Sequence, residues 1–413
     1  MRYSTNPKNG DRISLLGLGC MRFPRSGRRI VQEKANEIVA SAIELGINYF
    51  DTAYIYRGTE EALGNALVNC GKRDSVFLAT KLPHFMCKKE EDFDRFFNTQ
   101  LKRLKSDWVD YYLMHMLSSK ESWERLTSIN IEHWIEKKRK EGKIRNIGFS
   151  FHGGREAFIE LLDEYSWDFC MVQYNYYDEN DQASACGIRV AHEKGIPVFV
   201  MEPLRGGLLA DKLPEAAKRV FRKVDKSRSP AEWALRWLYD QPEVTMALSG
   251  MSSTLQLAEN TQVTNNSSPG MISGTERSAY KDAVIALKRS IKVPCTTCGY
   301  CMPCPHGVDI PSCFACYNES YSVGLISGIA QYFQITGQLE AKQSDASKCV
   351  ACGKCERHCP QKIKIAKELL KVKRRMKTFI IKPLAALTRK NLAFQTWLTG
   401  LHDLFPGKLS RKK

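Results

Sequence analysis

The stretch Ile47-Asn-Tyr-Phe-Asp51-Thr-Ala-Tyr-Ile-Tyr56 is a short apolar run that ends in an acidic residue and reaches a tyrosine five residues later. Similar runs recur along the chain and alternate with amphipathic helical stretches. The candidate strands are Ser14–Cys20, Ile47–Asp51, Val76–Lys81, Val109–His115, Ile144–Ser150, Asp168–Tyr174, Ile196–Met201 and Thr245–Ser249. The helical stretches include Glu33–Leu45, Glu91–Leu104, Ile131–Glu141, Gly154–Tyr165, Ser184–Lys194 and Pro230–Asp240.

This alternation predicts an α/β fold. Strands that are apolar along most of their length indicate a parallel sheet that is covered on both faces, and eight strand–helix units fit a closed (β/α)8 TIM barrel. A Rossmann sheet is the competing prediction. No Gly-x-Gly-x-x-Gly opens a helix after the first strand, so the barrel is preferred.

Polar residues stand at the ends of three successive predicted strands. Asp51 and Tyr56 follow one strand, Lys81 ends the next, and His115 ends the third. In a TIM barrel such positions face the active site, although a single lysine or histidine there is more often a structural group. A tyrosine whose pKa is ordinarily about 10 becomes a better proton donor beside a buried lysine. A Schiff-base aldolase using Lys81 is an alternative, but it leaves Tyr56 unexplained.

From Leu16-Gly-Leu-Gly-Cys-Met21 to Ala258-Glu-Asn260, the sequence resembles the aldo-keto reductases, with the matching segments in order. The resemblance implies that Asp51, Tyr56, Lys81 and His115 form a catalytic tetrad for nicotinamide-dependent reduction of a small-molecule carbonyl, or the reverse alcohol oxidation. It also implies a set of cofactor-binding residues, which comprises Met21, Ser150, Gln173, Met201, Ser249, Gly250, Gln256, Glu259 and Asn260.

The sequence departs from the family pattern at several cofactor positions. Phe151 replaces the usual asparagine after Ser150, and Met201 stands where an aromatic residue commonly stacks on the nicotinamide. Gly250 and Gln256 occupy positions where basic residues often bind a 2'-phosphate. Because NADPH would lose its main distinguishing contact there, we expect NADH to be favoured over NADPH.

The second half of the chain carries two cysteine runs, Cys295-Thr-Thr-Cys-Gly-Tyr-Cys-Met-Pro-Cys304-Pro305 and Cys349-Val-Ala-Cys-Gly-Lys-Cys-Glu-Arg-His-Cys359-Pro360. They resemble the ligand runs of bacterial-type ferredoxins, which hold 4Fe-4S clusters. The resemblance implies two clusters with interleaved ligands. The first takes Cys295, Cys298, Cys301 and Cys359, and the second takes Cys349, Cys352, Cys355 and Cys304.

Two alternatives stay open for this region. The last pair of the first run is one residue closer than in ferredoxins, so Cys313 or Cys316 could replace Cys304 as a ligand. Zinc is the alternative to iron, because Cys-x2-Cys pairs also build zinc ribbons. Ribbons usually use isolated pairs, so clusters are favoured over zinc.

Composition divides the chain into three parts. We expect a barrel domain at 1–292, a small, mainly helical ferredoxin-like domain at 293–370 and a basic amphipathic tail at 371–413, with a polar linker from Thr261 to Gly270. The tail carries +11 of the net charge of +17. Such a tail could bind an acidic electron-transfer partner or an anionic membrane surface, or simply pack on the cluster domain. Charge concentrated at one end does not indicate nucleic-acid binding.

Two further observations concern the compartment and the role of the cysteines. The first residues lack the apolar stretch of a signal peptide, so a cytoplasmic protein is expected. Ten of the fifteen cysteines lie between Cys295 and Cys359, which favours metal or cluster binding over disulfides. Two other functions stay open: an iron-sulphur electron-transfer protein whose barrel binds a nucleotide or partner, and an enzyme whose clusters only stabilise the fold.

Overall fold

The fold is described from a computed structural model that covers residues 1–27, 29–322, 325, 328–329, 332, 335–336 and 343–376. These residues form two compact units, one made of Met1–Leu213 with Ala217–Val284, the other of Pro214–Ala216 with the residues from Ile285 on. Among the described residues, no helix is both long enough and apolar enough to cross a bilayer.

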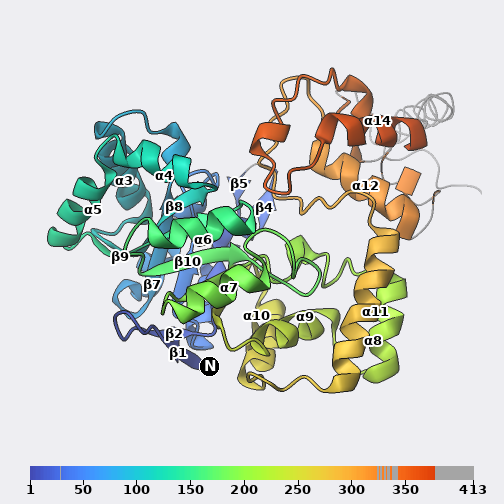
Figure 1. The fold of residues 1–413 in the computed structure, drawn as a ribbon, viewed down its shortest axis with the longest axis horizontal. Helices are drawn as coiled ribbons and strands as arrows, with labels where there is room; N and C mark the ends of the chain where they lie inside the picture. The colour runs from blue at the N-terminus through green and yellow to red at the C-terminus, as the bar shows by residue number, and fades with distance from the viewer. Residues whose placement is uncertain are drawn as a thin grey trace, which may run out of the picture. The chain divides into compact units, whose positions relative to one another are not determined.

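The first unit is a closed barrel of eight parallel strands, as predicted (Figure 1). In chain order the strands are β3 (Leu16–Gly19), β6 (Tyr49–Asp51), β7 (Phe77–Leu82), β8 (Val109–Leu117), β9 (Ile144–Phe151), β10 (Phe169–Gln173), β11 (Val198–Met201) and β12 (Val244–Ser249). Each strand pairs in parallel with the next, and β12 closes the barrel against β3. All eight predicted strands are therefore confirmed, and the Rossmann alternative is excluded.

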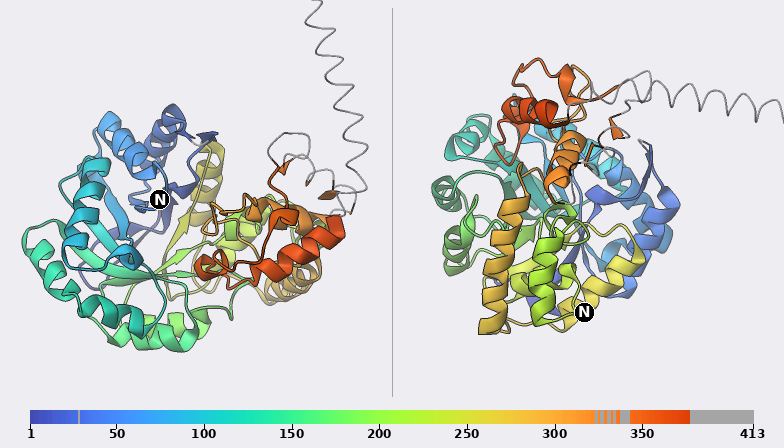
Figure 2. Two further views of the ribbon diagram at one scale, coloured as in Figure 1. Left: turned by 90° about the horizontal axis from the view of Figure 1, so that it is seen from above. Right: turned by 90° about the vertical axis from the view of Figure 1, so that its right-hand side faces the viewer.

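Helices lie outside these strands (Figure 2). They are α1 (Gln32–Glu44), α2 (Thr59–Cys70), α3 (Glu91–Leu104), α4 (Lys120–Thr127), α5 (Ile131–Lys140), α6 (Arg155–Asp163), α7 (Ser184–Glu193), α8 (Glu215–Val224), α9 (Pro230–Tyr239), α10 (Thr254–Asn265) and α11 (Gly274–Ser290). The linker prediction is wrong in its first half, because α10 continues to Asn265. Thr261 and Thr264 are buried there, so these polar residues are part of the packed fold and not of an exposed linker.

Large side chains fill the barrel interior. Tyr49, Tyr111, Phe169 and Phe199 pack edge to face or tilted, with ring centres 5.0–5.6 Å apart. Gly17 in β3 makes room for them, since a Cβ at this position would lie 2.8 Å from the sulphur of Met246. The interior is therefore a packed core, and the chemistry has to take place at the barrel ends.

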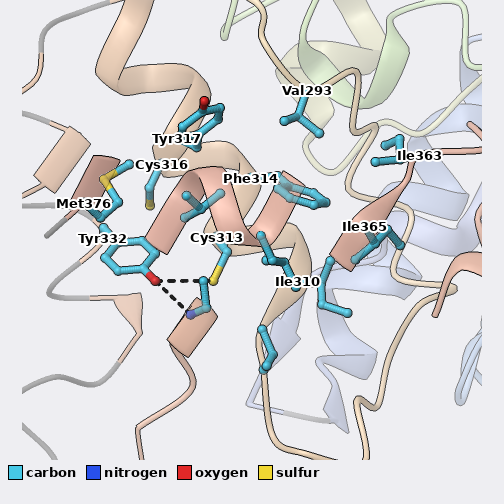
Figure 3. Packing of buried hydrophobic residues seen from close by; sticks show 14 residues of the cluster. Val293, Ile310, Cys313, Phe314, Cys316, Tyr317, Tyr332, Ile363, Ile365 and Met376 are labelled. Carbon is cyan, nitrogen blue, oxygen red and sulfur yellow. Dashed lines mark hydrogen bonds between the residues drawn. The ribbon is translucent and has the colours of Figure 1, made fainter. Parts of the chain in front are cut away.

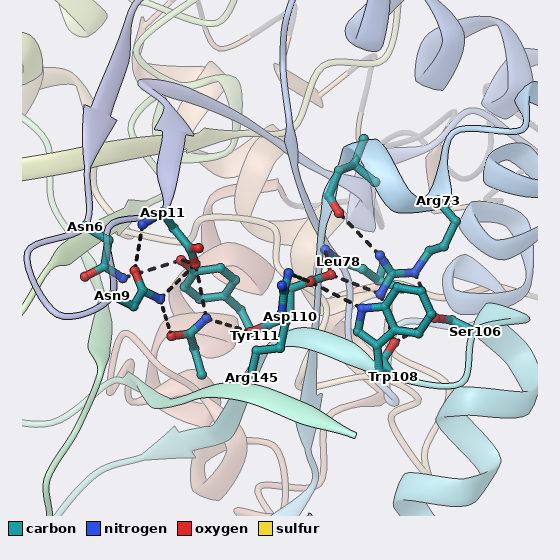
Figure 4. Close-up of polar contacts among 12 residues, drawn as sticks. Asn6, Asn9, Asp11, Arg73, Leu78, Ser106, Trp108, Asp110, Tyr111 and Arg145 are labelled. Atoms are coloured by element: carbon teal, nitrogen blue, oxygen red, sulfur yellow. Dashed lines mark hydrogen bonds and ion pairs between the residues drawn. The ribbon is translucent and has the colours of Figure 1, made fainter. Parts of the chain in front are cut away.

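The amino-terminal end of the barrel is closed by a hairpin of β1 (Tyr3–Thr5) and β2 (Arg12–Ser14). Asp11 beside β2 accepts hydrogen bonds from the Tyr111 hydroxyl at 2.6 Å and from Asn146 at 3.3 Å (Figure 4). On the same end of the strands, Asp110 pairs with Arg73 at 3.0 Å and with Arg145 at 2.9 Å. The polar groups at this end of the barrel are thus paired with one another, as expected where residues contribute to stability and not to catalysis.

The second unit has a core of its own. The helices α12 (Ile310–Ser322) and α14 (Ile365–Met376) pack together around Phe314, Leu369 and Val372. Tyr332 belongs to this core, where its hydroxyl accepts the backbone N–H of Ala346 at 2.8 Å (Figure 3). A small, mainly helical unit after the barrel is what the sequence predicted.

The described part of the basic tail belongs to α14. Ile365, Leu369, Val372 and Met376, which recur at helical spacing in the sequence, are all buried against this core. Helix α14 is described as far as Met376, and the apolar stripe between Phe394 and Phe405 lies outside the described residues.

Candidate functional site

The four residues predicted as a tetrad lie at the carboxyl ends of neighbouring strands. Asp51 ends β6, Lys81 lies near the end of β7, and His115 lies near the end of β8. Tyr56 is on the turn between β6 and α2. Because β6, β7 and β8 are adjacent in the barrel, this topology brings the four side chains together.

Lys81 is the central group of this cluster. Its side chain is 2% exposed, and its amine donates to Asp51 Oδ1 at 2.5 Å and to the carbonyl of Thr52 at 2.8 Å. The same amine lies over the Tyr56 ring, 5.2 Å from the ring centre. A cation therefore sits between a carboxylate and a phenol in a site nearly closed to water.

His115 meets the edge of Tyr56. The two ring centres are 5.7 Å apart, and the rings are nearly perpendicular. Burial, with a smaller effect from the Lys81 cation, lowers the pKa of His115 well below its usual value, so the imidazole is neutral at pH 7. Burial also raises the pKa of Asp51, and the Lys81 cation opposes that rise.

A bulge in β8 fixes the backbone beside His115. The strand register shifts between Met114 and Leu117, and Met116 adopts a positive φ of 62°. The Met116 N–H then donates to the Ser150 hydroxyl at 2.9 Å, which joins the tetrad to a predicted cofactor residue. Strained backbone of this kind is tolerated where the surrounding structure holds it in place.

A buried network under Lys81 escaped the sequence analysis. Gln100 in α3 donates to the carbonyl of Lys81, to Thr80 and to Glu60, each at 2.9 Å. Tyr112 in turn donates to Gln100 at 2.7 Å. Glu60 follows Tyr56 closely in sequence, and this proximity could have indicated that it belongs to the site. Gln100 lies on a separate helix, and no sequence pattern links it to the site.

The predicted nicotinamide residues lie at the ends of the next strands. Ser150 is in β9, Gln173 ends β10 and Met201 ends β11. Gln173 donates to Asp178 at 2.8 Å and accepts from Gln182 at 2.8 Å. Gln182 also contacts His152 at 3.1 Å. These buried groups hold the Gln173 amide in one orientation.

An ion pair behind Gln173 was also missed. Arg205 donates to Asp178 at 2.7 Å, and both side chains are almost completely buried. Glu202 lies nearby, and burial raises its pKa from 4.5 to about 7. Nothing in the sequence indicated these residues, because Asp178 and Arg205 lie in loops after different strands.

The remaining cofactor candidates surround the end of β12. Met21 lies in the short helix after β3, Ser249 ends β12, and Asn260 in α10 donates to the Ser249 hydroxyl at 3.5 Å. Gln256 accepts the N–H of Ser252, while Glu259 is exposed. The Arg22 side chain lies against Gly250, since a Cβ at that glycine would be 3.1 Å from Arg22 Cδ.

The cysteines of the second unit form two groups. One pocket is lined by a set of four thiols together with Ile310, Phe314 and Ile363, and the set is Cys295, Cys298, Cys301 and Cys359. The same thiols act on one another electrostatically, because burial and these three neighbours raise the pKa of Cys301. We call this group the first thiol set.

We call the four cysteines that the resemblance implies for the second cluster, Cys304, Cys349, Cys352 and Cys355, the second thiol set. Burial, followed by the nearby thiols of Cys304 and Cys349, raises the pKa of Cys355 to about 11. Cys313 and Cys316 are instead buried in the core with Tyr332 and Phe314. The structure thus places the first set around one pocket, and it places Cys355 near Cys304 and Cys349.

The donor sets can be compared with what a cluster requires. Four cysteines lining one pocket offer the all-thiolate ligation of a 4Fe-4S cluster, which spreads its ligands over four iron atoms. In the described part of the chain, no group of three or more His, Cys, Asp or Glu side chains is arranged to hold a metal ion by itself. The residues present fit a cluster.

Comparisons with known proteins agree with this architecture. The aldo/keto reductase family model matches residues 15–269, and the 4Fe-4S dicluster domain model matches residues 294–363. The uncharacterized oxidoreductase YqkF of Bacillus subtilis is 30% identical over 285 residues, which cover 61% of this chain and 88% of that protein. L-galactose dehydrogenase of Arabidopsis thaliana is 28% identical, with coverage of 63% and 88%.

Among solved structures, an aldo-keto reductase of Bacillus halodurans in its holo form superposes with a TM-score of 0.57 and 26% identity. The superposition covers 68% of this chain and 96% of the Bacillus halodurans protein. The closed barrel, the clustered strand-end residues and the match over residues 15–269 lead to one conclusion. The chain is an oxidoreductase of the aldo/keto reductase family that carries a C-terminal 4Fe-4S domain.

Proposed function

We propose that the protein reduces the carbonyl group of a small molecule, or oxidises the corresponding alcohol, with a nicotinamide cofactor. The placement of Lys81 carries this proposal. A buried cation held by Asp51 and facing the ring of Tyr56 is the arrangement that lowers the cost of removing a proton from a phenol. A structural ion pair would need no tyrosine beside it.

Each tetrad residue has a role of its own. Tyr56 gives its proton to the carbonyl oxygen in reduction and takes it back in oxidation. Lys81 stabilises the phenolate that is left, and Asp51 holds Lys81 in place. His115 is neutral, so it can donate a hydrogen bond to the carbonyl oxygen and orient it without adding charge.

The cofactor is assigned to the strand ends beyond the tetrad. A reduced nicotinamide, when bound, supplies the hydride that adds to the carbonyl carbon. Ser150 and Gln173 would hold its amide group, and Met201 would lie against its ring. We propose NADH as the preferred cofactor, because Gly250 and Gln256 bring no charge to the 2'-phosphate position. A relative from Schizosaccharomyces pombe, 23% identical, carries NADP(+) in its name, so the preference has to be measured.

We further propose that the two thiol sets hold two 4Fe-4S clusters, one on each set. Such clusters accept or give one electron each. Tight turns at positive-φ residues bring successive thiols to one side, with Thr297 at φ 56° and Gly299 at φ 79° in the first run and Ala351 at 56° and Gly353 at 72° in the second. The same conformation at equivalent positions of both runs supports an equivalent role.

The mechanism can be tested with Tyr56→Phe. With NADH and 4-nitrobenzaldehyde as a generic carbonyl, the variant is expected to lose about 100-fold or more of kcat. Tyr54→Phe is the matched control, because Tyr54 packs against Phe96 and Arg103 and has no place in the proposed chemistry. Visible absorbance should show unchanged clusters in both variants. Turnover retained by Tyr56→Phe would exclude the tyrosine as proton donor.

The main alternative is an iron-sulphur electron-transfer protein that uses its barrel to bind a nucleotide or a partner. The two cysteine runs and the match to a 4Fe-4S dicluster domain favour it, since carbonyl reduction by hydride needs no cluster. Anaerobic NADH addition distinguishes the cases. Loss of cluster absorbance and a reduced-cluster paramagnetic signal would show that nicotinamide and clusters exchange electrons. NADH-dependent turnover that persists after the clusters are removed would show that carbonyl reduction does not depend on them, which would exclude the clusters as its working centres.

A further inference from the structure

The two thiol sets lie in different surroundings. The first lines a pocket with apolar side chains, and Ile310, Phe314 and Ile365 in that lining are each no more than 1% exposed. In the second set, Cys352 is exposed. Val350, beside Cys349, is 60% exposed, and Met302, between Cys301 of the first set and Cys304 of the second, is 38% exposed. Of the eight cysteines in the two sets, Cys352 is the exposed one, and the other seven are partly buried. The second set is therefore the more open to approach from solvent.

Around the second set, the basic side chains are more exposed than the acidic ones. Lys348, Lys354, Arg357 and Lys362 are all exposed. The acidic residues of the same loops face inward: Asp345 is 2% exposed and accepts the N–H of Ser347, while Glu356 accepts the N–H of Ala366. The solvent therefore meets positive charge around an apolar centre.

We propose that this surface is the docking site of an acidic one-electron carrier protein. We name it the cluster-two rim and define it by Met302, Lys348, Val350, Cys352, Lys354 and Arg357. An apolar centre beside a ligand thiol, bordered by cations, matches a transient interface that is steered by charge. The inference rests on the proposed function in one respect, namely that the second thiol set holds a redox-active cluster.

The proposed reaction at the cluster-two rim is the transfer of one electron. One electron passes between the carrier and the cluster held by the second thiol set, so that one is oxidised and the other is reduced. No bond forms or breaks, and no proton has to move. The carrier must come close to Cys352, which is why exposure of this ligand matters.

A charge-reversal pair tests the proposal on the full, cluster-loaded protein. Lys348→Glu with Lys354→Glu changes the rim, whereas Lys373→Glu with Arg374→Glu changes net charge equally on the exposed face of α14. Electron exchange with an acidic flavodoxin is followed anaerobically by stopped flow over a range of ionic strength. Exchange with a small neutral mediator shows whether the cluster itself is intact.

The expected result is a second-order rate constant that falls with salt in the wild type and falls about 10-fold at low salt in the rim variant. The α14 variant should change less than about twofold, and the mediator should react equally with all three proteins. Equal effects of the two variants, or no effect of either, would overturn the assignment. So would binding to phosphatidylserine vesicles that the rim variant abolishes while carrier exchange stays unchanged.

The outcome is separable from that of the proposed function. NADH-dependent reduction of 4-nitrobenzaldehyde is measured on the same samples. Rim-dependent carrier exchange without carbonyl reduction would support the docking site and reject the proposed reaction. Carbonyl reduction with rim-independent exchange would do the opposite.

Discussion

The amine of Lys81 lies 5.2 Å from the centre of the Tyr56 ring, within a site where the lysine itself is 2% exposed. Removing this cation should therefore affect both chemistry and folding. We expect Lys81→Met to lower kcat about 100-fold or more and to lower the free energy of unfolding by about 3 kcal/mol, because Asp51 is left charged and buried.

A second variant separates the two effects. Asp51→Asn combined with Lys81→Met removes the buried charge as well as its partner. Its urea unfolding midpoint should recover most of the loss, while its kcat should remain low. A double variant as unstable as Lys81→Met would contradict this account of the pair.

Substitutions at the amino-terminal end of the barrel should change the free energy of unfolding but not kcat. Arg73 contacts Asp110, Ser106 and the carbonyl of Trp108 at 2.8–3.0 Å, and Asp110 is 2% exposed. We expect Arg73→Ala to cost about 2–4 kcal/mol of unfolding free energy with kcat unchanged. Arg145→Ala is the control: its side chain is 60% exposed, and the cost should be below about 1 kcal/mol. A matching loss of kcat in Arg73→Ala would argue against a structural role.

Cofactor preference should be altered at Gly250, but only together with Arg22. A Cβ at Gly250 would lie 3.1 Å from Arg22 Cδ, so Gly250→Arg alone should bind either cofactor poorly. With Arg22→Ala as well, the new guanidinium has room, and the Kd ratio should shift towards NADPH about 10-fold. Fluorescence titration of both cofactors measures this. If the ratio of the two Kd values is unchanged in the double variant, the 2'-phosphate does not bind beside residue 250.

The carboxyl group of Glu202 should make stability depend on pH. Burial raises its pKa from 4.5 to about 7, against the opposing effect of Arg205 and Arg22 and with a contribution from Asp178. The folded protein then binds this proton more tightly than the unfolded chain, so the free energy of unfolding falls as pH rises from about 4.5 to about 7. Glu202→Gln should lose less stability than the wild type between pH 5 and pH 8. The exposed Glu193→Gln should behave like the wild type.

The sequence predicted what depends on local pattern. The apolar run from Ile47 to Asp51 has to be a buried strand, and a strand followed by a helix has few other ways to pack, so the barrel and the strand-end positions of Asp51, Lys81 and His115 could be foreseen. Gln100 could not, because its partners come from β7, β8 and α2 and meet only in three dimensions. The same holds for Asp178 and Arg205. Residues from Thr261 to Asn265 looked like a linker because they are polar, yet burial of Thr261 and Thr264 makes them part of a helix.

The interleaving of the two cysteine runs has a consequence for biosynthesis. In the proposed ligand assignment, Cys359 completes the first thiol set and Cys304 belongs to the second. During translation, therefore, neither set is complete when the first run leaves the ribosome, although the last barrel strand has by then been followed by 45 or more residues of chain. With that assignment, the barrel can fold before either cluster site is complete, and both sites become complete only when the second run has been made.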